Sequence, residues 1–130
     1  MLVINPVQDK NYQEEVCIAC GFKFDPSLFL YSEKENDKLI AGCQFDILGK
    51  TSVISDFGMV KETQEDIEAL IILGRAVLNF LELSGVEACV FDTDSENNDK
   101  YAQMIGFKKE GERFVISLKG LFDSKCNHCK

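Results

Sequence analysis

Two pairs of cysteines are the most recognisable chemical feature of this sequence. Cys17 and Cys20 have two residues between them, and Cys126 and Cys129 repeat that spacing near the end of the chain. Cysteine pairs of this kind are common zinc ligands, because four thiolates suit the tetrahedral geometry that zinc prefers. One prediction is therefore a zinc site made by both pairs, which requires them to meet in space.

Each pair also has other interpretations. The first lies in a stretch with helical spacing, where cysteines three positions apart share one face, so we expect core packing for it. The second lies in a polar tail, residues 123–130, together with the lone His128. Metal capture, redox chemistry and a disordered end are all open for this tail. Cys43 and Cys89 alternate inside predicted strands and are expected in the core.

Three carboxylates are candidates for a general base. Asp46, Asp56 and Glu62 lie on predicted strands or at their ends, where a carboxylate could remove a proton from an attacking group. Acidic residues in such positions are also typical of the solvated side of an alternating strand, and no motif selects one of the three.

The elements that must position these groups follow the order β-α-β-β-β-α-β-α-β-β. A first strand over residues 1–5 leads into a helix that we expect to start with Asn5 as its cap and Pro6 in its first turn. Gly21 can end that helix. Three strands follow, and Gly49-Lys50 fits the two-residue loop of a hairpin.

The strongest helix signal covers residues 66–84, where apolar side chains leave only a narrow polar edge, so this helix is expected to be mostly buried. Thr63 and Asp66 resemble a capping box at its start. A buried strand over 86–91, a shorter helix over 95–105 and a hairpin over 107–118 complete the chain. The pattern predicts an α/β (α+β) fold with a mixed sheet and helices on its faces.

Length and composition indicate one folded domain. The chain has 130 residues, of which 45% are apolar. We expect a single domain over residues 1–122 and a polar tail over 123–130. No apolar stretch is long enough to cross a membrane and the N-terminus does not resemble a signal peptide, so a cytoplasmic location without a membrane partner is expected.

The net charge of −8 limits the possible partners. Nucleic acid is excluded as a partner because the sequence has no basic stripe to displace counterions from phosphates. The charge favours a cationic acceptor, such as an amine, over an anionic ligand. It also serves solubility, which is the simpler interpretation.

The arrangement of these elements resembles the GNAT (N-acetyltransferase) superfamily over nearly the whole chain. The similarity is densest where Ser84-Gly85-Val86 ends the long helix and Ile105-Gly106-Phe107 ends the short one. It implies a GNAT-like mixed, mostly antiparallel sheet with helices on both faces. It also implies acetyl-CoA or another acyl-CoA bound between two splayed parallel strands, residues 53–60 and 86–91, and transfer of the acyl group to a small-molecule amine.

The resemblance also implies a set of cofactor-binding residues. Pantetheine is expected along the backbone of Met59 and Val60, and the pyrophosphate at the start of the long helix, where free N–H groups attract anions. The family signature there is Gln/Arg-x-x-Gly-x-Gly/Ala. Its best match begins at Gln64 and ends at Ala69, with Ile67 in place of the middle glycine.

Two features set this loop apart from the family pattern. A second match, which ends on Gly74, begins with Ala69 and leaves only a short helix, so the first match is preferred. In that match Glu65, Asp66 and Glu68 surround the expected phosphate site and oppose the attraction of the helix dipole for an anion. Acidic residues are also ordinary at the start of a helix.

The general acid and the acceptor side depart from the family pattern as well. Many members have a tyrosine four residues before the glycine of the Gly-Phe ending, where its phenol can protonate the leaving thiolate. Here Ala102 has that place and Tyr101 comes one residue earlier, a rotation of about 100° around the helix. Tyr101 is thus a candidate proton donor and equally a candidate core or rim aromatic. The chain is short between Gly21 and Leu28, so the acceptor side is either open or completed by a second subunit in a homodimer.

Two functions follow from the sequence. The leading one is acyl-CoA-dependent N-acetyl transfer to a small amine. The alternative is a non-catalytic GNAT-like domain that has lost CoA binding and acts in assembly or regulation, which Ile67, the acidic helix start and Ala102 all favour.

Overall fold

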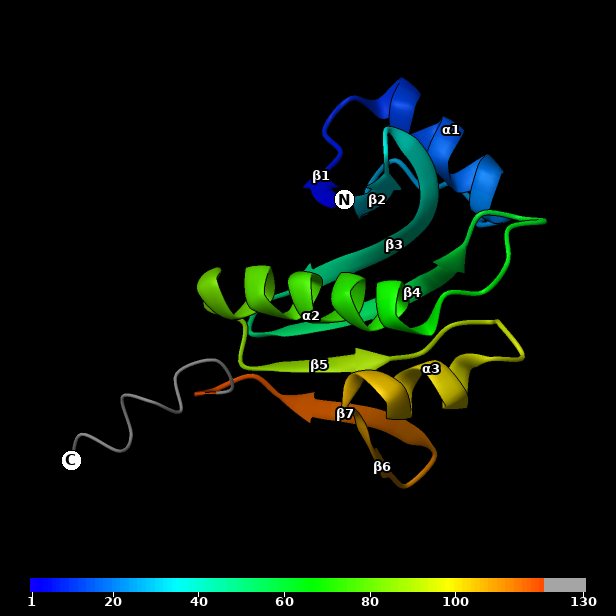
Figure 1. The fold of residues 1–130 in the computed structure, drawn as a ribbon. Helices are drawn as coiled ribbons and strands as arrows, with labels where there is room; N and C mark the ends of the chain where they lie inside the picture. Colours follow the sequence, from blue (N-terminus) through cyan, green and yellow to red (C-terminus); the bar gives the residue numbers. More distant parts are fainter. Residues whose placement is uncertain (121–130) are drawn as a thin grey trace.

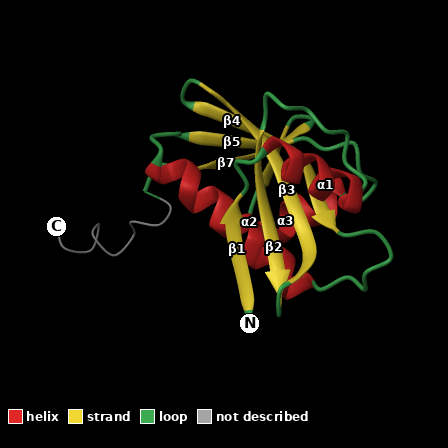
Figure 2. Cartoon of the chain, turned by 90° about the horizontal axis from the view of Figure 1, so that it is seen from above, coloured by secondary structure: helices red, strands yellow, loops and turns green. Residues whose placement is uncertain are grey.

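The computed structural model describes residues 1–120, and the predicted tail over 123–130, with Cys126, His128 and Cys129, lies outside the described residues. Seven strands form one sheet in the order β1-β2-β3-β4-β5-β7-β6, with α1 on one face and α2 and α3 on the other (Figures 1 and 2). The elements are β1 (Leu2–Pro6), α1 (Lys10–Cys20), β2 (Phe29–Glu35), β3 (Lys38–Leu48), β4 (Thr51–Met59), α2 (Ile67–Leu83), β5 (Ala88–Phe91), α3 (Asn98–Ile105), β6 (Lys108–Glu110) and β7 (Arg113–Ser117).

The expected order of elements and the mixed sheet are confirmed. Every neighbouring pair of strands is antiparallel except β4 and β5, which run parallel. The two-residue loop at Gly49-Lys50 is also confirmed, and Gly49 has the positive φ of 68° that a tight hairpin requires.

The predicted start of α1 was wrong. Pro6 is the last residue of β1 and pairs with Tyr31, and the helix begins four residues later with Asp9 as its cap. The Asp9 side chain accepts a hydrogen bond from the backbone N–H of Asn11 at 3.0 Å. The physical reason is that β1 is an edge strand, where a proline costs no ladder hydrogen bond on its solvent side.

Helix α2 forms the main core against the sheet. Leu70, Leu73, Val77, Leu78 and Leu81 are fully buried on its inner side. A fully buried side chain of this size stabilises the fold by about 1.5–3 kcal/mol. Helix α2 is therefore fixed against this face of the sheet, and so is the end of the preceding loop that joins the helix.

The cap of α2 differs from the expected capping box. Asp66 is itself the cap residue, and its carboxylate accepts a hydrogen bond from the backbone N–H of Ala69 at 3.0 Å. Thr63 lies in the preceding loop, and its backbone N–H donates a hydrogen bond to the carbonyl of Val60. The helix therefore begins at Ile67, and a resident carboxylate bonds one of its first amides.

Helices α2 and α3 pack closely where α2 has a glycine. A Cβ added at Gly74 would lie 2.6 Å from Cδ1 of Ile105, so no larger residue fits without a shift.

Helix α3 is shorter than predicted because residues 93–97 form a turn. In that turn the Asn98 side chain accepts hydrogen bonds from the N–H and hydroxyl of Thr93.

Across residues 1–120, none of the helices combines the length and apolar character that a membrane crossing needs.

Candidate functional site

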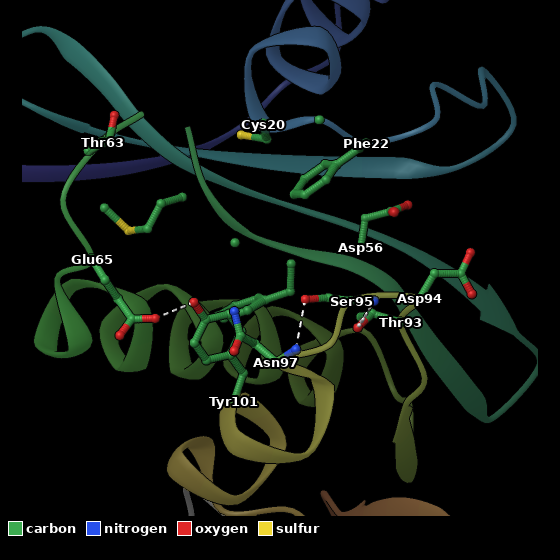
Figure 3. A pocket seen from close by; sticks show the side chains of 14 residues that line it. Cys20, Phe22, Asp56, Thr63, Glu65, Thr93, Asp94, Ser95, Asn97 and Tyr101 are labelled. Carbon is green, nitrogen blue, oxygen red and sulfur yellow. Dashed lines mark hydrogen bonds between the residues drawn. The ribbon is translucent and has the colours of Figure 1, made fainter. Parts of the chain in front are cut away.

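The two parallel strands separate halfway along β4. They pair only over Thr51–Ile54 and Ala88–Phe91, and the last bond runs from the N–H of Asp92 to the carbonyl of Ile54 at 3.0 Å. At that point β4 has a bulge, where the register against β3 shifts. A bulge bends its strand and increases the local twist, so β4 leaves β5 from Ser55 onward. The opening is a cleft of about 450 Å³, which we name the β4–β5 cleft (Figure 3).

Within residues 1–120, backbone groups of β4 beyond Ile54 are left without a partner strand on the side of this cleft. The N–H of Val60 donates to the carbonyl of Ile40 on β3 at 2.8 Å. Because backbone groups alternate in direction along a strand, those of Phe57 and Met59 point away from β3 and into the cleft. Met59 thus lines the cleft, where pantetheine is expected. The backbone N–H of Val60, in contrast, is hydrogen-bonded to β3.

Asp56 is the one of the three candidate bases that lines the cleft. Gln44 on β3 donates from Nε2 to Asp56 Oδ2 at 2.7 Å. Burial raises the pKa of Asp56, the Gln44 hydrogen bond opposes that rise, and the charge of Asp94 adds to it. A half-buried carboxylate with a raised pKa is a better proton acceptor than an ordinary surface aspartate.

Gln44 is a functional candidate that the sequence did not reveal. It is buried, and besides Asp56 its Nε2 donates to the carbonyl of Lys23 at 3.0 Å. Its Oε1 accepts from the N–H of Asp25 at 3.3 Å and from the Cys17 thiol at 3.5 Å. One side chain therefore fixes Asp56 and the loop after α1 together. The only available signal was a polar residue among the small and apolar residues of the middle of β3.

A second cavity of about 460 Å³ adjoins the cleft at Asp56. Four carboxylates line it, contributed by Asp25, Asp56, Asp92 and Asp94, together with Lys23. We name it the acidic pocket. In Figure 3, Asp56 and Asp94 lie toward one end of the cleft and Glu65 and Tyr101 toward the other. The predominance of negative charge favours a cationic group in this pocket.

The other two candidate bases lie elsewhere. Asp46 is further along β3, where its carboxylate accepts a hydrogen bond from the N–H of Ile47 at 2.9 Å. Glu62 is exposed in the loop before α2, where its φ of 65° is unusual for a residue with a side chain. Neither is among the residues that line the cleft.

Tyr101 lines the cleft from α3, and its hydroxyl donates to Glu65 at 2.5 Å. Its ring packs edge-on against Phe57. Burial raises the pKa of Tyr101, and the hydrogen bond to Glu65 and that residue's charge raise it further. The phenol therefore stays protonated at neutral pH, while its proton is directed at Glu65. Lys100 also bonds Glu65, at 2.8 Å.

In the loop expected to bind pyrophosphate, a carboxylate of the protein occupies the position expected for the phosphate of the ligand. Asp66 accepts the hydrogen bond of Ala69 N–H, and Glu68 lies in the first turn. The side chain of Ala69 is buried, whereas Gln64 and Ile67 are exposed. The competing match that ended on Gly74 has a simpler explanation, because this glycine lies in mid-helix against Ile105.

The first cysteine pair does not share one environment. Cys17 is fully buried in a small core between α1 and the sheet, and Cys20 is partly buried and lines the cleft. Burial raises the pKa of Cys17 to about 11 and of Cys20 to about 12, so both stay as thiols. Among residues 1–120 no group of three or more His, Cys, Asp and Glu side chains could hold a metal ion. A site shared with Cys126 and Cys129 involves residues outside those described and stays a prediction.

Comparison with known proteins gives a result at the level of structure. No family model matches the sequence, and no curated protein matches it either. Solved structures do. The ribosomal-protein-S18-alanine N-acetyltransferase of Escherichia coli superposes with a TM-score of 0.67 at 10% identity, covering 91% of this chain and 94% of that one.

Two further matches are structures that contain coenzyme A. A Bacillus subtilis acetyltransferase in complex with CoA gives a TM-score of 0.67 at 13% identity, over 90% of this chain and 99% of that one. The N-acetyltransferase YhhK of E. coli, bound to coenzyme A, gives 0.66 at 15% identity, over 90% and 98%. Identities this low establish architecture and not activity. This chain therefore has the GNAT acetyltransferase fold.

Proposed function

We propose that this protein transfers an acyl group from a thioester to the nitrogen of a small cationic amine. The observation that carries the proposal is the β4–β5 cleft, where unpartnered backbone of Phe57 and Met59 lies beside the half-buried carboxylate of Asp56. The acidic pocket supports an amine as the acceptor, because its charge attracts a cation. The fold supports acyl transfer, because similar structures are acetyltransferases.

Acyl-CoA is the donor that this fold implies, and only part of it suits these residues. The acyl and pantetheine end suits an elongated cleft along a strand with free backbone groups. The pyrophosphate does not suit the start of α2, where Asp66 already bonds the N–H of Ala69. The chemistry below therefore concerns the thioester alone.

The reaction needs the amine in its neutral form. In the proposed mechanism Asp56 takes a proton from the ammonium group, and the nitrogen lone pair then attacks the thioester carbonyl carbon. A backbone N–H of Phe57 or Met59 stabilises the oxygen on which charge develops. The C–N bond forms and the C–S bond breaks. The sulfur leaves with the electron pair and takes up one proton to become a thiol, while the second proton from nitrogen passes to solvent. The proton held by Asp56 returns through solvent to the group that protonated the sulfur, so one proton is released for each acyl group transferred.

Tyr101 is the candidate source of the proton for sulfur. Its hydroxyl lines the cleft and remains protonated, which this role requires. Its present partner is Glu65, so donation to a leaving thiolate requires the hydroxyl to exchange that hydrogen bond for one to sulfur.

The test is acyl transfer from S-acetyl-pantetheine and from acetyl-CoA to a panel of small mono- and diamines, with N-acetyl products detected by mass spectrometry. We expect product with at least one pair. Asp56→Asn should lower the rate at least about a hundredfold, the usual contribution of a general base. Asp46→Asn is the matched control, since it removes a strand carboxylate outside the cleft, and should retain the rate. Absence of product with both donors and all amines would reject the proposal.

A second candidate is a non-catalytic domain that acts in assembly or regulation. The specific observation in its favour is the resident Asp66 carboxylate at the start of α2. This alternative predicts that neither pantetheine nor CoA shifts the melting temperature of the native protein, and that the same holds for Asp56→Asn.

A further inference from the structure

We infer that the acyl donor of this protein is a thioester of the pantetheine type without a pyrophosphate, held by the β4–β5 cleft alone. The inference rests on the proposed function and names the chemical class of its donor. Four features of the described residues carry it: the cap of α2, the charges around it, the positions of the nearby lysines, and the lining of the cleft.

The cap of α2 occupies the position that an anionic ligand needs. Helix N-termini bind phosphate through unpaired N–H groups and the positive end of the helix dipole. Here Asp66 Oδ1 accepts the N–H of Ala69 at 3.0 Å, so the chain itself supplies the anion. A carboxylate at this position also neutralises part of the dipole, which reduces the attraction for a second anion.

Further negative charge surrounds that cap. Glu68 stands in the first turn of α2, and Glu65 precedes Asp66 and lines the cleft. Burial, with smaller contributions from the charges of Asp66 and Glu35, raises the pKa of the fully buried Glu33 on β2 to about 7. A pyrophosphate would thus enter a region in which Glu65, Asp66 and Glu68 are already present.

Two lysines of the described residues lie near this loop, and each already contacts another residue. Lys100 on α3 pairs with Glu65 at 2.8 Å, so its charge is compensated. Lys61 lies in the loop itself, but its side chain rests against Gly21 at the end of α1: a Cβ added there would lie 2.8 Å from the lysine Cε. Neither contact places a lysine charge on the first amides of α2, where the pyrophosphate is expected.

The cleft, in contrast, suits an uncharged chain that contains amides. Its lining includes the apolar side chains of Phe22, Phe57 and Met59 and the uncharged polar residues Thr63 and Asn97, while the carboxylates of Asp56, Asp94 and Glu65 lie toward its two ends (Figure 3). Backbone groups of β4 face it without partners, as described above. A pantetheine arm is an uncharged chain with amide groups, and these can pair with such backbone.

The experiment compares the binding of pantetheine and of CoA to the whole protein by calorimetry, at about 20 mM and 300 mM salt. We expect CoA to bind no more tightly than pantetheine, and to bind more weakly at low salt, where repulsion is less screened. Asp66→Asn keeps a side-chain oxygen for the cap and removes the charge. Combined with Ile67→Gly, it should raise the affinity for CoA about tenfold and leave that for pantetheine unchanged. Glu112→Gln, an equal loss of charge at the tip of the β6–β7 hairpin, is the control and should change neither.

The outcomes separate this inference from the proposed function. If the native protein binds CoA tenfold or more tightly than pantetheine, and more tightly at low salt, the inference is wrong while acyl transfer stands. If neither probe binds and S-acetyl-pantetheine yields no product, the proposed function fails and the inference fails with it. If the double variant gains no affinity for CoA while pantetheine binds, the charge of Asp66 is not what excludes the nucleotide, and the inference is again overturned.

Discussion

Replacing Glu33 by glutamine should stabilise this protein at neutral and alkaline pH and leave its stability at mildly acidic pH almost unchanged. Glu33 is fully buried on β2, and neither of its carboxyl oxygens has a hydrogen-bond partner among the described residues. Burial, followed by the charges of Asp66 and Glu35, raises its pKa from 4.5 to about 7. An unpaired buried carboxylate is costly, so the folded protein holds the proton more tightly than the unfolded chain does.

The sign and size of the effect follow from that shift. Between pH 4.5 and about 7 the folded state binds more protons than the unfolded state, so the free energy of unfolding falls as the pH rises. The contribution of protonated Glu33 to the free energy of unfolding is fully present below pH 4.5 and is lost by about pH 7. A rise of this size in pKa corresponds to at most about 3–4 kcal/mol, at 1.36 kcal/mol for each unit. Glu33→Gln removes the ionisation and with it the pH dependence.

The assay is urea unfolding followed by circular dichroism at pH 5, 6, 7 and 8. The native protein should lose stability across this series relative to Glu33→Gln, with the two curves furthest apart at pH 8. Glu112→Gln is the matched control, because Glu112 is exposed at the tip of the β6–β7 hairpin and is not among the charges that raise the pKa of Glu33. Its curve should run parallel to that of the native protein. Parallel curves for the native protein and Glu33→Gln would refute a buried, unpaired carboxyl group at this position.

Three further substitutions test the packing and the chemistry. Gly74→Ala should destabilise the fold by about 1–3 kcal/mol in urea unfolding, because its Cβ would overlap Ile105; an unchanged midpoint would show that α2 and α3 are not in close contact. Tyr101→Phe should cost about 1–2 kcal/mol through loss of the hydroxyl bond to Glu65, and should also slow thioester cleavage if the phenol protonates sulfur. Asp56→Asn should abolish the rise of transfer rate with pH that a carboxylate base produces, with little change in melting temperature, and a retained pH profile would exclude Asp56 as the base.

The sequence predicted the fold well because its signals were local and consistent. The long helix was recognised from apolar residues on most of its surface, and the hairpin at Gly49-Lys50 from turn chemistry. The parallel pairing of β4 and β5 was predicted from the resemblance to the GNAT superfamily. The start of α1 was misjudged by four residues and the cap of α2 is Asp66 itself, because Asp9 and Asp66 had competitors nearby, Asn5 and Thr63, that could also cap a helix.

The site was predictable only in part, because it depends on contacts between distant segments. Met59 was expected in the cleft and lines it. Asp56 could not be separated from Asp46 and Glu62, since a strand pattern does not say where two strands diverge. Gln44 could not be predicted as part of the site, because a polar residue in a strand is ordinary on a solvated face and only its four hydrogen bonds reveal its role.

The same excess of acidic residues that keeps the protein negatively charged can account for both proposed substrates. At one end of the cleft Asp25, Asp92 and Asp94 join Asp56 around a cavity that attracts a cation. At the other end Asp66 and its acidic neighbours oppose a diphosphate. The negative potential attracts a protonated amine and repels a nucleotide, so it favours a cationic acceptor and an uncharged donor at the same time. Reversing charge at one end should therefore alter the preference for one substrate without altering the other, since the two ends are lined by different carboxylates.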